Sequence, residues 1–266
     1  MVLAQRMRRL AHKLEPRKTL AVFSASPKPL WEDAPVFVTE RTSDGVTVLA
    51  ADRPPVNAMN VELLEDVVGA LERRAADPPA ALVIAGREGV FSAGADLKAV
   101  PGYAPEQQRR MVAGINAMVL AAYGLPCPVV AAVTGHAIAG GLVLALCADH
   151  RVASADGRYG LTEVKVGVPY PQAAIGVVRA ELSPQAARLL ALGSRLTDAA
   201  DCMRLGVFDE VVAPGQVVER AVAVARELAG LPAETYAKTK SQLRGASLAA
   251  MREAAARDPL LEAWVS

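Results

Sequence analysis

Two segments of the sequence place small residues where a backbone N–H group could meet a ligand. In residues 89–98 and 133–149, an apolar strand is followed by glycines and alanines and then by a predicted helix. The first N–H groups of a helix have no partner within it, and the helix dipole favours negative charge at that end. Such turns suit an oxygen that becomes negatively charged during a reaction. The alternative is that the small residues only let each helix pack closely on its strand.

Strands and helices alternate around these turns. Strands are predicted at residues 36–41, 46–50, 81–85 and 128–134, the first two joined by a hairpin turn at Asp44-Gly45. Asn60 is placed to cap a helix in which Leu63, Leu64, Val67, Val68 and Leu71 recur at helical spacing. A polar helix is predicted at residues 105–123. This alternation up to residue 153 predicts an α/β fold with right-handed crossovers.

The second half of the sequence is predicted to be mostly helical. Helices are expected at residues 172–181, 183–192, 197–205, 215–229, 231–244 and 248–257, with a short strand at residues 207–212. Thr197 stands where the N-cap of one of these helices belongs.

Composition restricts the class of protein. The 266 residues are 52% apolar, which is enough for one large core, and the net charge of +1 gives no reason to expect nucleic acid or membrane partners. Three well-separated cysteines without metal-ligand spacing predict a reduced, cytoplasmic protein with no metal site. No apolar run approaches the roughly 20 residues that span a bilayer. The basic residues 1–34 are interpreted as a disordered tail outside the fold, with a transit peptide as the alternative.

Four motifs in order resemble those of the crotonase (enoyl-CoA hydratase/isomerase) superfamily. They are Asn57-Ala-Met-Asn60, Ala93-Gly-Ala-Asp96, the Gly140-Gly141 turn, and Gly160-Leu-Thr-Glu163 with Gly167-Val-Pro169. The resemblance implies an α/β fold with a ββα spiral core at residues 35–195 and a C-terminal helical trimerisation region at residues 196–266. It also implies an acyl-CoA substrate, no cofactor beyond the coenzyme A of that substrate, and a homotrimer or dimer of trimers.

By this resemblance, the N–H groups of Ala95 and Gly140 form an oxyanion hole for the thioester oxygen. The residues expected to line the CoA and acyl site are Val56, Ala58, Ala93, Asp96, Leu97, Lys98, His136 and Val143. Asp96 is expected mainly to cap or pair within its loop. Lys98 matches a position near the CoA phosphates, or is simply an exposed lysine. His136 is a pocket candidate, with a packed or solvent-facing side chain as the alternative.

Many hydratases of the family carry two catalytic glutamates, whose positions fall here on Val143 and Glu163. Adding water to a double bond suits two carboxylates, one for the water and one for the carbon proton. Moving a double bond from the 3 to the 2 position needs only one base, and the Δ3-Δ2-enoyl-CoA isomerases are similar to this sequence in having an apolar residue at the first position. The apolar Val143, Leu144 and Val166 are expected to raise the pKa of Glu163.

Other interpretations stay open at this point. Glu163 could instead be a surface residue paired with Lys165 or Arg158. Glu106 could supply a second carboxylate for hydration, and the same oxyanion hole could serve thioester hydrolysis or decarboxylation. A non-catalytic acyl-CoA binder is a further alternative, as is an RNA binder, although the basic residues outside the tail are scattered. Candidate pocket residues are Tyr103, Tyr123 and Tyr170, and Trp264 is expected to be partly exposed or covered by a partner chain.

Overall fold

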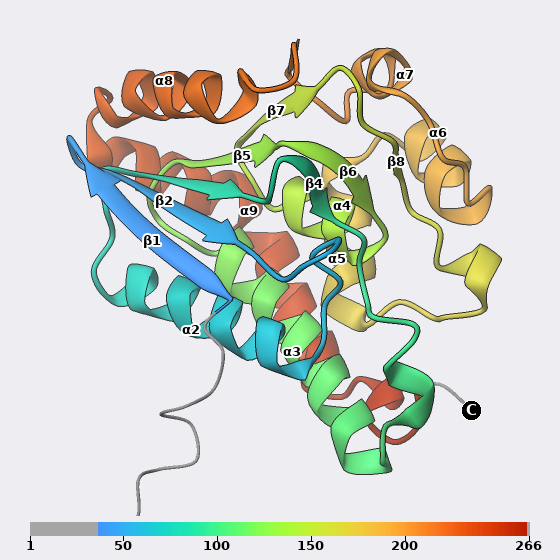
Figure 1. Cartoon of the computed structure of the whole chain (residues 1–266). Coiled ribbons are helices and arrows are strands. Elements are labelled where there is room, and N and C mark those ends of the chain that lie inside the picture. Colours follow the sequence, from blue (N-terminus) through green and yellow to red (C-terminus); the bar gives the residue numbers. More distant parts are fainter. Residues whose placement is uncertain (1–36, 265–266) are drawn as a thin grey trace, which may run out of the picture. The chain divides into compact units, whose positions relative to one another are not determined.

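A six-stranded sheet carries the core of the computed structural model, which describes residues 37–264 (Figure 1). The tail predicted at residues 1–34 lies outside the described residues. The strands are, in spatial order, β1 (Val38–Ser43), β2 (Val46–Ala51), β3 (Ala81–Ala85), β5 (Val129–Val133), β7 (His150–Ser154) and β9 (Glu210–Val212). Only β1 and β2 pair antiparallel, and all the other pairs are parallel.

The hairpin between β1 and β2 forms where the sequence predicts it. Ser43 pairs with Val46, so the turn has two residues, Asp44 and Gly45, with φ of 53° and 77°. Two positive φ angles give a turn whose twist matches that of the strands, and Asp-Gly is a favoured pair for it.

A second, three-stranded parallel sheet is built from strands that alternate along the chain with strands of the first. It contains β4 (Gly89–Ser92), β6 (Gly135–Ile138) and β8 (Tyr159–Gly160), in that order. Each of these strands comes directly after a strand of the larger sheet and before a helical segment. The chain therefore repeats a strand–strand–helix unit, and the predicted α/β class with a ββα spiral is confirmed.

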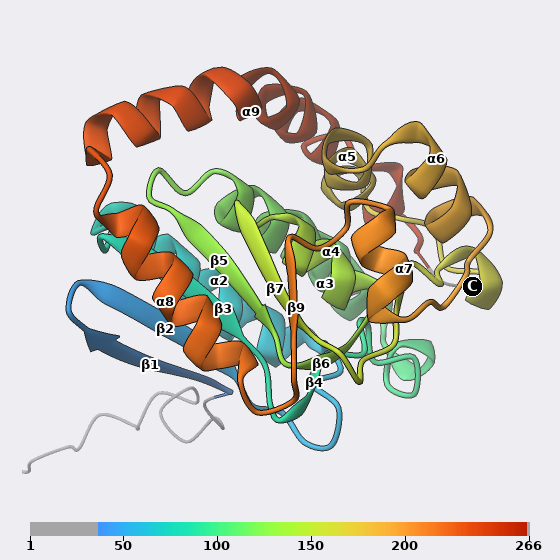
Figure 2. The same cartoon turned by 90° about the horizontal axis from the view of Figure 1, so that it is seen from above.

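Helices cover both faces of the larger sheet (Figure 2). Val83 and Val130 pack with α8 (Val217–Ala229), whereas Leu82 and Ile84 belong to the core formed with helices of the opposite face. Those helices are α2 (Val61–Ala76), α3 (Pro105–Tyr123) and α4 (Gly140–Leu146). Both α8 and β9 come from the predicted oligomerisation region at residues 196–266: α8 packs on one face of the larger sheet, and β9 pairs with β7 at its edge.

The remaining helices agree with the sequence in part. α5 (Gln172–Glu181) has the predicted bounds, and α6 (Pro184–Ala187) continues as a π-helical turn, η3 (Arg188–Leu192). α7 (Ala199–Arg204) is capped by Asp198, whose carboxylate accepts a 2.8 Å bond from the Asp201 N–H. The prediction that Thr197 caps this helix is wrong, because the backbone of Thr197 pairs with that of Tyr159. Within residues 37–264, no helix is both long and apolar enough to cross a membrane.

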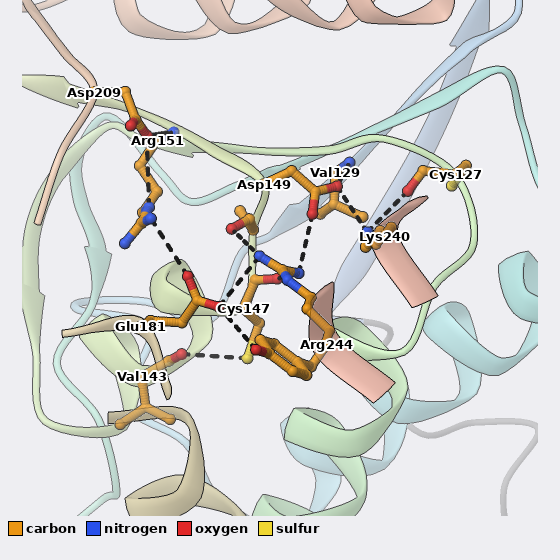
Figure 3. A network of polar contacts seen from close by, with 12 residues as sticks. Cys127, Val129, Val143, Cys147, Asp149, Arg151, Glu181, Asp209, Lys240 and Arg244 are labelled. Atoms are coloured by element: carbon orange, nitrogen blue, oxygen red, sulfur yellow. Dashed lines mark hydrogen bonds and ion pairs between the residues drawn. The ribbon is translucent and has the colours of Figure 1, made fainter. Parts of the chain in front are cut away.

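The last long helix is also a correction. Two helices were expected on either side of residues 245–247, but α9 (Ala233–Ala255) is continuous. Its Lys240 and Arg244 form ion pairs with Asp149 (Figure 3), and the N–O distances are 2.7 and 3.0 Å. Arg244 also donates to the carbonyls of Cys147 and Ala148, both at 2.9 Å. These contacts and packing against α5 hold the helix through Gly245, although glycine lowers helix propensity.

Candidate active site

The first turn is held by the Asn57-Ala-Met-Asn60 motif. The Met59 N–H donates to Gly94 O at 2.7 Å, and the Asp96 N–H donates to Met59 O at 2.8 Å. In this parallel pairing, the residue between the two bonded neighbours directs its own N–H to the other side. The Ala95 N–H therefore points away from Met59. Asn57, which is fully buried, fixes the motif by donating to the Ala51 and Phe91 carbonyls.

The second turn starts α4. The first backbone bond of this helix runs from the Val143 N–H to Ala139 O at 3.1 Å, so the N–H groups of Gly140 and Gly141 precede it. Ala139 has a φ of 52°, a conformation that L side chains rarely adopt.

The two turns touch, and their glycines have different roles. A Cβ on Gly94 would lie 2.8 Å from the Ala139 Cβ, and a Cβ on Gly141 would lie 2.3 Å from Ser92 O. Gly140 is not crowded in this way, because its nearest neighbour would be the Met59 Sδ at 3.4 Å. Close packing therefore explains Gly141, and another reason is needed for Gly140.

A mostly apolar cavity of about 70 Å³ lies between the turns and α5. Ala95, Gly140, Val143 and Glu163 all line it, as the sequence predicts for one site. Two more of the predicted substrate residues, Ala93 and Leu97, line it as well. Among residues 37–264, Glu163 is the only carboxylate in its wall.

Glu163 is buried without a charged partner. The residue is 7% exposed, and its Oε2 accepts a hydrogen bond of 2.7 Å from the Tyr170 hydroxyl. Burial raises the pKa of Glu163, and the smaller effect of the Tyr170 hydrogen bond opposes this rise. No ion pair joins it to the described Lys165 or Arg158, so the interpretation as a paired surface residue is wrong. The predicted direction of the pKa shift is confirmed.

Several other predicted site residues lie outside the cavity wall. These are Val56, Ala58, Asp96, Lys98 and His136. Asp96 holds its own loop, pairing with Arg53 at 3.0 Å and accepting from the Lys98 and Ala99 N–H groups. His136 is exposed, and its Nδ1 accepts from the Arg158 N–H at 2.9 Å.

Two further expectations fail at the cavity. Glu106 is exposed and paired with Arg109 at 3.0 Å, so it is not a second carboxylate in the wall. Leu144 is buried but lines a different cavity, so it is not part of the wall around Glu163. Of the three tyrosines considered as pocket residues, Tyr170 is the one that lines this cavity.

Part of the wall carries no recognisable signal in the sequence. Ile115 of α3 and Ala174 of α5 occupy positions typical of any helix core. Trp264 also lines the cavity, is 5% exposed, and donates from Nε1 to Pro169 O at 3.1 Å. Its predicted exposure or cover by a partner chain is wrong, because its own chain buries it.

The C-terminal segment that carries Trp264 is fixed by a buried polar cluster. Asp258, 3% exposed, accepts from the Asn116 Nδ2 at 2.9 Å and from the Gln172 N–H at 2.8 Å. The Asn116 Oδ1 in turn accepts from the Ala173 N–H at 2.9 Å. The cluster joins this segment to α3 and α5, so the cavity wall at Trp264 is well anchored.

Known proteins are similar to this chain in sequence and in fold. A model of the enoyl-CoA hydratase/isomerase family matches residues 41–263. A probable enoyl-CoA hydratase of Mycobacterium tuberculosis, EchA17, is 34% identical over 216 residues, which are 78% of this chain and 82% of that protein. Human mitochondrial enoyl-CoA delta isomerase 1 is 30% identical over 236 residues, covering 87% of this chain and 77% of the isomerase. The crystal structure of probable enoyl-CoA hydratase EchA3 from Mycobacterium tuberculosis has a TM-score of 0.77 at 33% identity and covers 82% of this chain and 92% of that chain. With its fold, its two turns and these matches in agreement, the chain belongs to the enoyl-CoA hydratase/isomerase (crotonase) superfamily of enzymes.

Proposed function

We propose that this enzyme is a Δ3-Δ2-enoyl-CoA isomerase with Glu163 as its one base. The observation that carries the proposal is the wall of the cavity. Within the described part of the chain, it contains a single carboxylate, Glu163, with Val143 where two-glutamate hydratases have their other one. Similarity to human enoyl-CoA delta isomerase 1 supports the same assignment.

In the proposed reaction, Glu163 takes a proton from C2 of a 3-enoyl thioester. The electrons of that C–H bond form a dienolate, whose charge develops on the thioester oxygen. The Ala95 and Gly140 N–H groups stabilise this charge, and losing one such donor typically costs about 3–4 kcal/mol of barrier stabilisation. Glu163 then returns the proton to C4, which leaves the double bond between C2 and C3. The reaction needs no cofactor beyond the coenzyme A of the substrate.

The environment of Glu163 suits both halves of this reaction. A base that must give its proton back works best when its pKa lies near the working pH. Burial moves the pKa of Glu163 in that direction, because the apolar wall disfavours the charged form.

Hydration is the second candidate, because the relative EchA17 is described as a probable hydratase, and EchA3 is described in one structure as a probable hydratase and in another as an isomerase. It requires a second group to activate water. Glu106 is exposed and paired with Arg109, which makes it a poor choice. Among residues 37–264, the other titratable group in the wall is the Tyr170 phenol.

The test follows a 3-enoyl-CoA and a 2-enoyl-CoA by NMR in heavy water, with the wild type, Glu163→Gln and Glu106→Gln. We expect the 3-enoyl ester to become the 2-enoyl ester without a 3-hydroxy product, and only Glu163→Gln to abolish this. A 3-hydroxyacyl product would establish hydration instead, and release of free CoA would point to thioester hydrolysis. The homotrimer implied by the family is checked separately by light scattering.

A further inference from the structure

We propose that Tyr170 is a positioning residue that holds one oxygen of Glu163 and leaves the other oxygen for the substrate. This inference rests on the proposed isomerase function. Its basis is the 2.7 Å hydrogen bond from the Tyr170 hydroxyl to Glu163 Oε2, made inside the cavity that both residues line. No other side-chain hydrogen bond or ion pair to Glu163 occurs in the described structure.

The direction of the bond follows from the chemistry of the two groups. Burial and the neighbouring carboxylate both raise the pKa of Tyr170, so the phenol keeps its proton at neutral pH. A neutral phenol donates, and a carboxylate can only accept. No lysine, arginine, histidine or second carboxylate of residues 37–264 lines the cavity. Besides a weaker hydrogen bond from its own backbone, the Tyr170 bond is therefore the polar contact that sets the Glu163 carboxyl.

The backbone, rather than the bond itself, places Tyr170. Tyr170 lies between Pro169 and Pro171, and the backbone of a residue before proline is restricted to extended conformations. The Val168 N–H donates to Glu163 O at 3.0 Å, and Pro169 O accepts from the Trp264 indole. Pro171 precedes α5 and its carbonyl accepts the first bond of that helix, from Ile175. The loop is therefore held from both sides when the hydroxyl is removed.

The consequence concerns which oxygen reacts. With Oε2 bound to Tyr170, Oε1 takes the proton from C2 and returns it to C4. Without the bond, the terminal torsion of the glutamate is broad and nearly two-fold, so either oxygen can face the substrate. The carboxylate also loses its only side-chain donor, which raises the pKa of Glu163 further. A hydrogen bond to a charged group is strong enough for an upward shift of about one to two pH units.

The test compares Tyr170→Phe with a matched control, Tyr123→Phe. The Tyr123 hydroxyl makes the same kind of bond, 2.8 Å to Glu181 Oε1, outside this cavity. For both variants, the pH–rate profile of the isomerase reaction is measured. The Glu163 carboxyl is also titrated by infrared difference spectroscopy against Glu163→Gln, which requires no turnover.

We expect Tyr170→Phe to move the acidic limb of the pH–rate profile and the titration midpoint of the Glu163 carboxyl to higher pH. We also expect kcat to fall, with little change in KM. Tyr123→Phe should move neither. An unchanged Glu163 midpoint in Tyr170→Phe would overturn the inference, even if the enzyme is an isomerase. If the midpoint moves in Tyr170→Phe but the wild-type protein has no isomerase activity, the positioning bond is supported and the proposed function is rejected.

Discussion

The two glycines of the second turn give opposite predictions for the same substitution. Gly140 and Gly141 are neighbours in the sequence, and both lie in the first turn of α4. If close packing were the reason for both, alanine would damage the fold equally at either position. The structure separates them, because only at Gly141 would a Cβ lie closer than 3 Å to backbone atoms.

The magnitudes follow from the contacts. In Gly141→Ala the Cβ would lie 2.3 Å from Ser92 O, in a strand that cannot yield easily because Ser92 Oγ donates to Asn57 O at 2.7 Å. Overpacking of this kind costs about 1–3 kcal/mol, and more where backbone must move. In Gly140→Ala the nearest atom is the Met59 Sδ at 3.4 Å, which is ordinary contact. That variant should gain about 0.4–1 kcal/mol from the reduced entropy of the unfolded chain.

Urea unfolding of both variants measures the difference. We expect the two free energies of unfolding to differ by about 1–4 kcal/mol, Gly141→Ala being the less stable. At an m value of about 2–3 kcal/mol/M, this separates the midpoints by roughly 1 M urea. Equal midpoints, or a larger loss in Gly140→Ala, would refute the reasoning. Gly140→Ala keeps its N–H group and should keep the proposed oxyanion donor.

Three further changes test the cavity. In urea unfolding, Glu163→Gln should stabilise the fold at pH 8 but not at pH 4. The pKa of Glu163 in the folded protein is raised above the ordinary 4.5, so the free energy of unfolding of the wild type is highest below pH 4.5 and falls as the pH rises through the folded-state pKa. Trp264→Ala should cost about 3–5 kcal/mol and shift kcat/KM towards longer enoyl-CoA chains, whereas an unchanged chain-length profile would remove Trp264 from the acyl site. Asn116→Leu should cost about 1–3 kcal/mol, because Ala173 N–H and Asp258 lose a partner, and should red-shift the Trp264 emission if the segment loosens.

Much of the fold could be predicted where the signals are local. The bounds of α3 and α5 and the Asp44-Gly45 turn depend on nearby residues, and they agree with the structure. The prediction of a break in α9 is wrong because Lys240 and Arg244 pair with Asp149, which lies 91 residues before Lys240 in the chain. No local propensity contains that contact.

The candidate site shows the same division. Positions within motifs could be found, and Ala95, Gly140, Val143 and Glu163 meet in one cavity. The sequence could not reveal residues whose role depends on how a strand or segment is oriented in the fold. His136 turns outward from β6, and Trp264 reaches the cavity only because the last segment folds back onto α5.

The buried charges of this chain are treated in two different ways, which bears on the role of Glu163. Lys240 and Arg244 both pair with Asp149, Arg244 also pairs with Glu181, and both cations donate to backbone carbonyls. Glu163 has no opposite charge and a single side-chain donor, although an isolated carboxylate is expensive to bury. Ala139, with a strained φ of 52°, lines the same cavity. The buried Asp258 also lacks a cation, but it accepts hydrogen bonds from Asn116 and from the backbone N–H groups of Gln172 and Leu260. A buried carboxylate with one side-chain donor and a strained backbone, both at one small cavity, are expected of a reactive site.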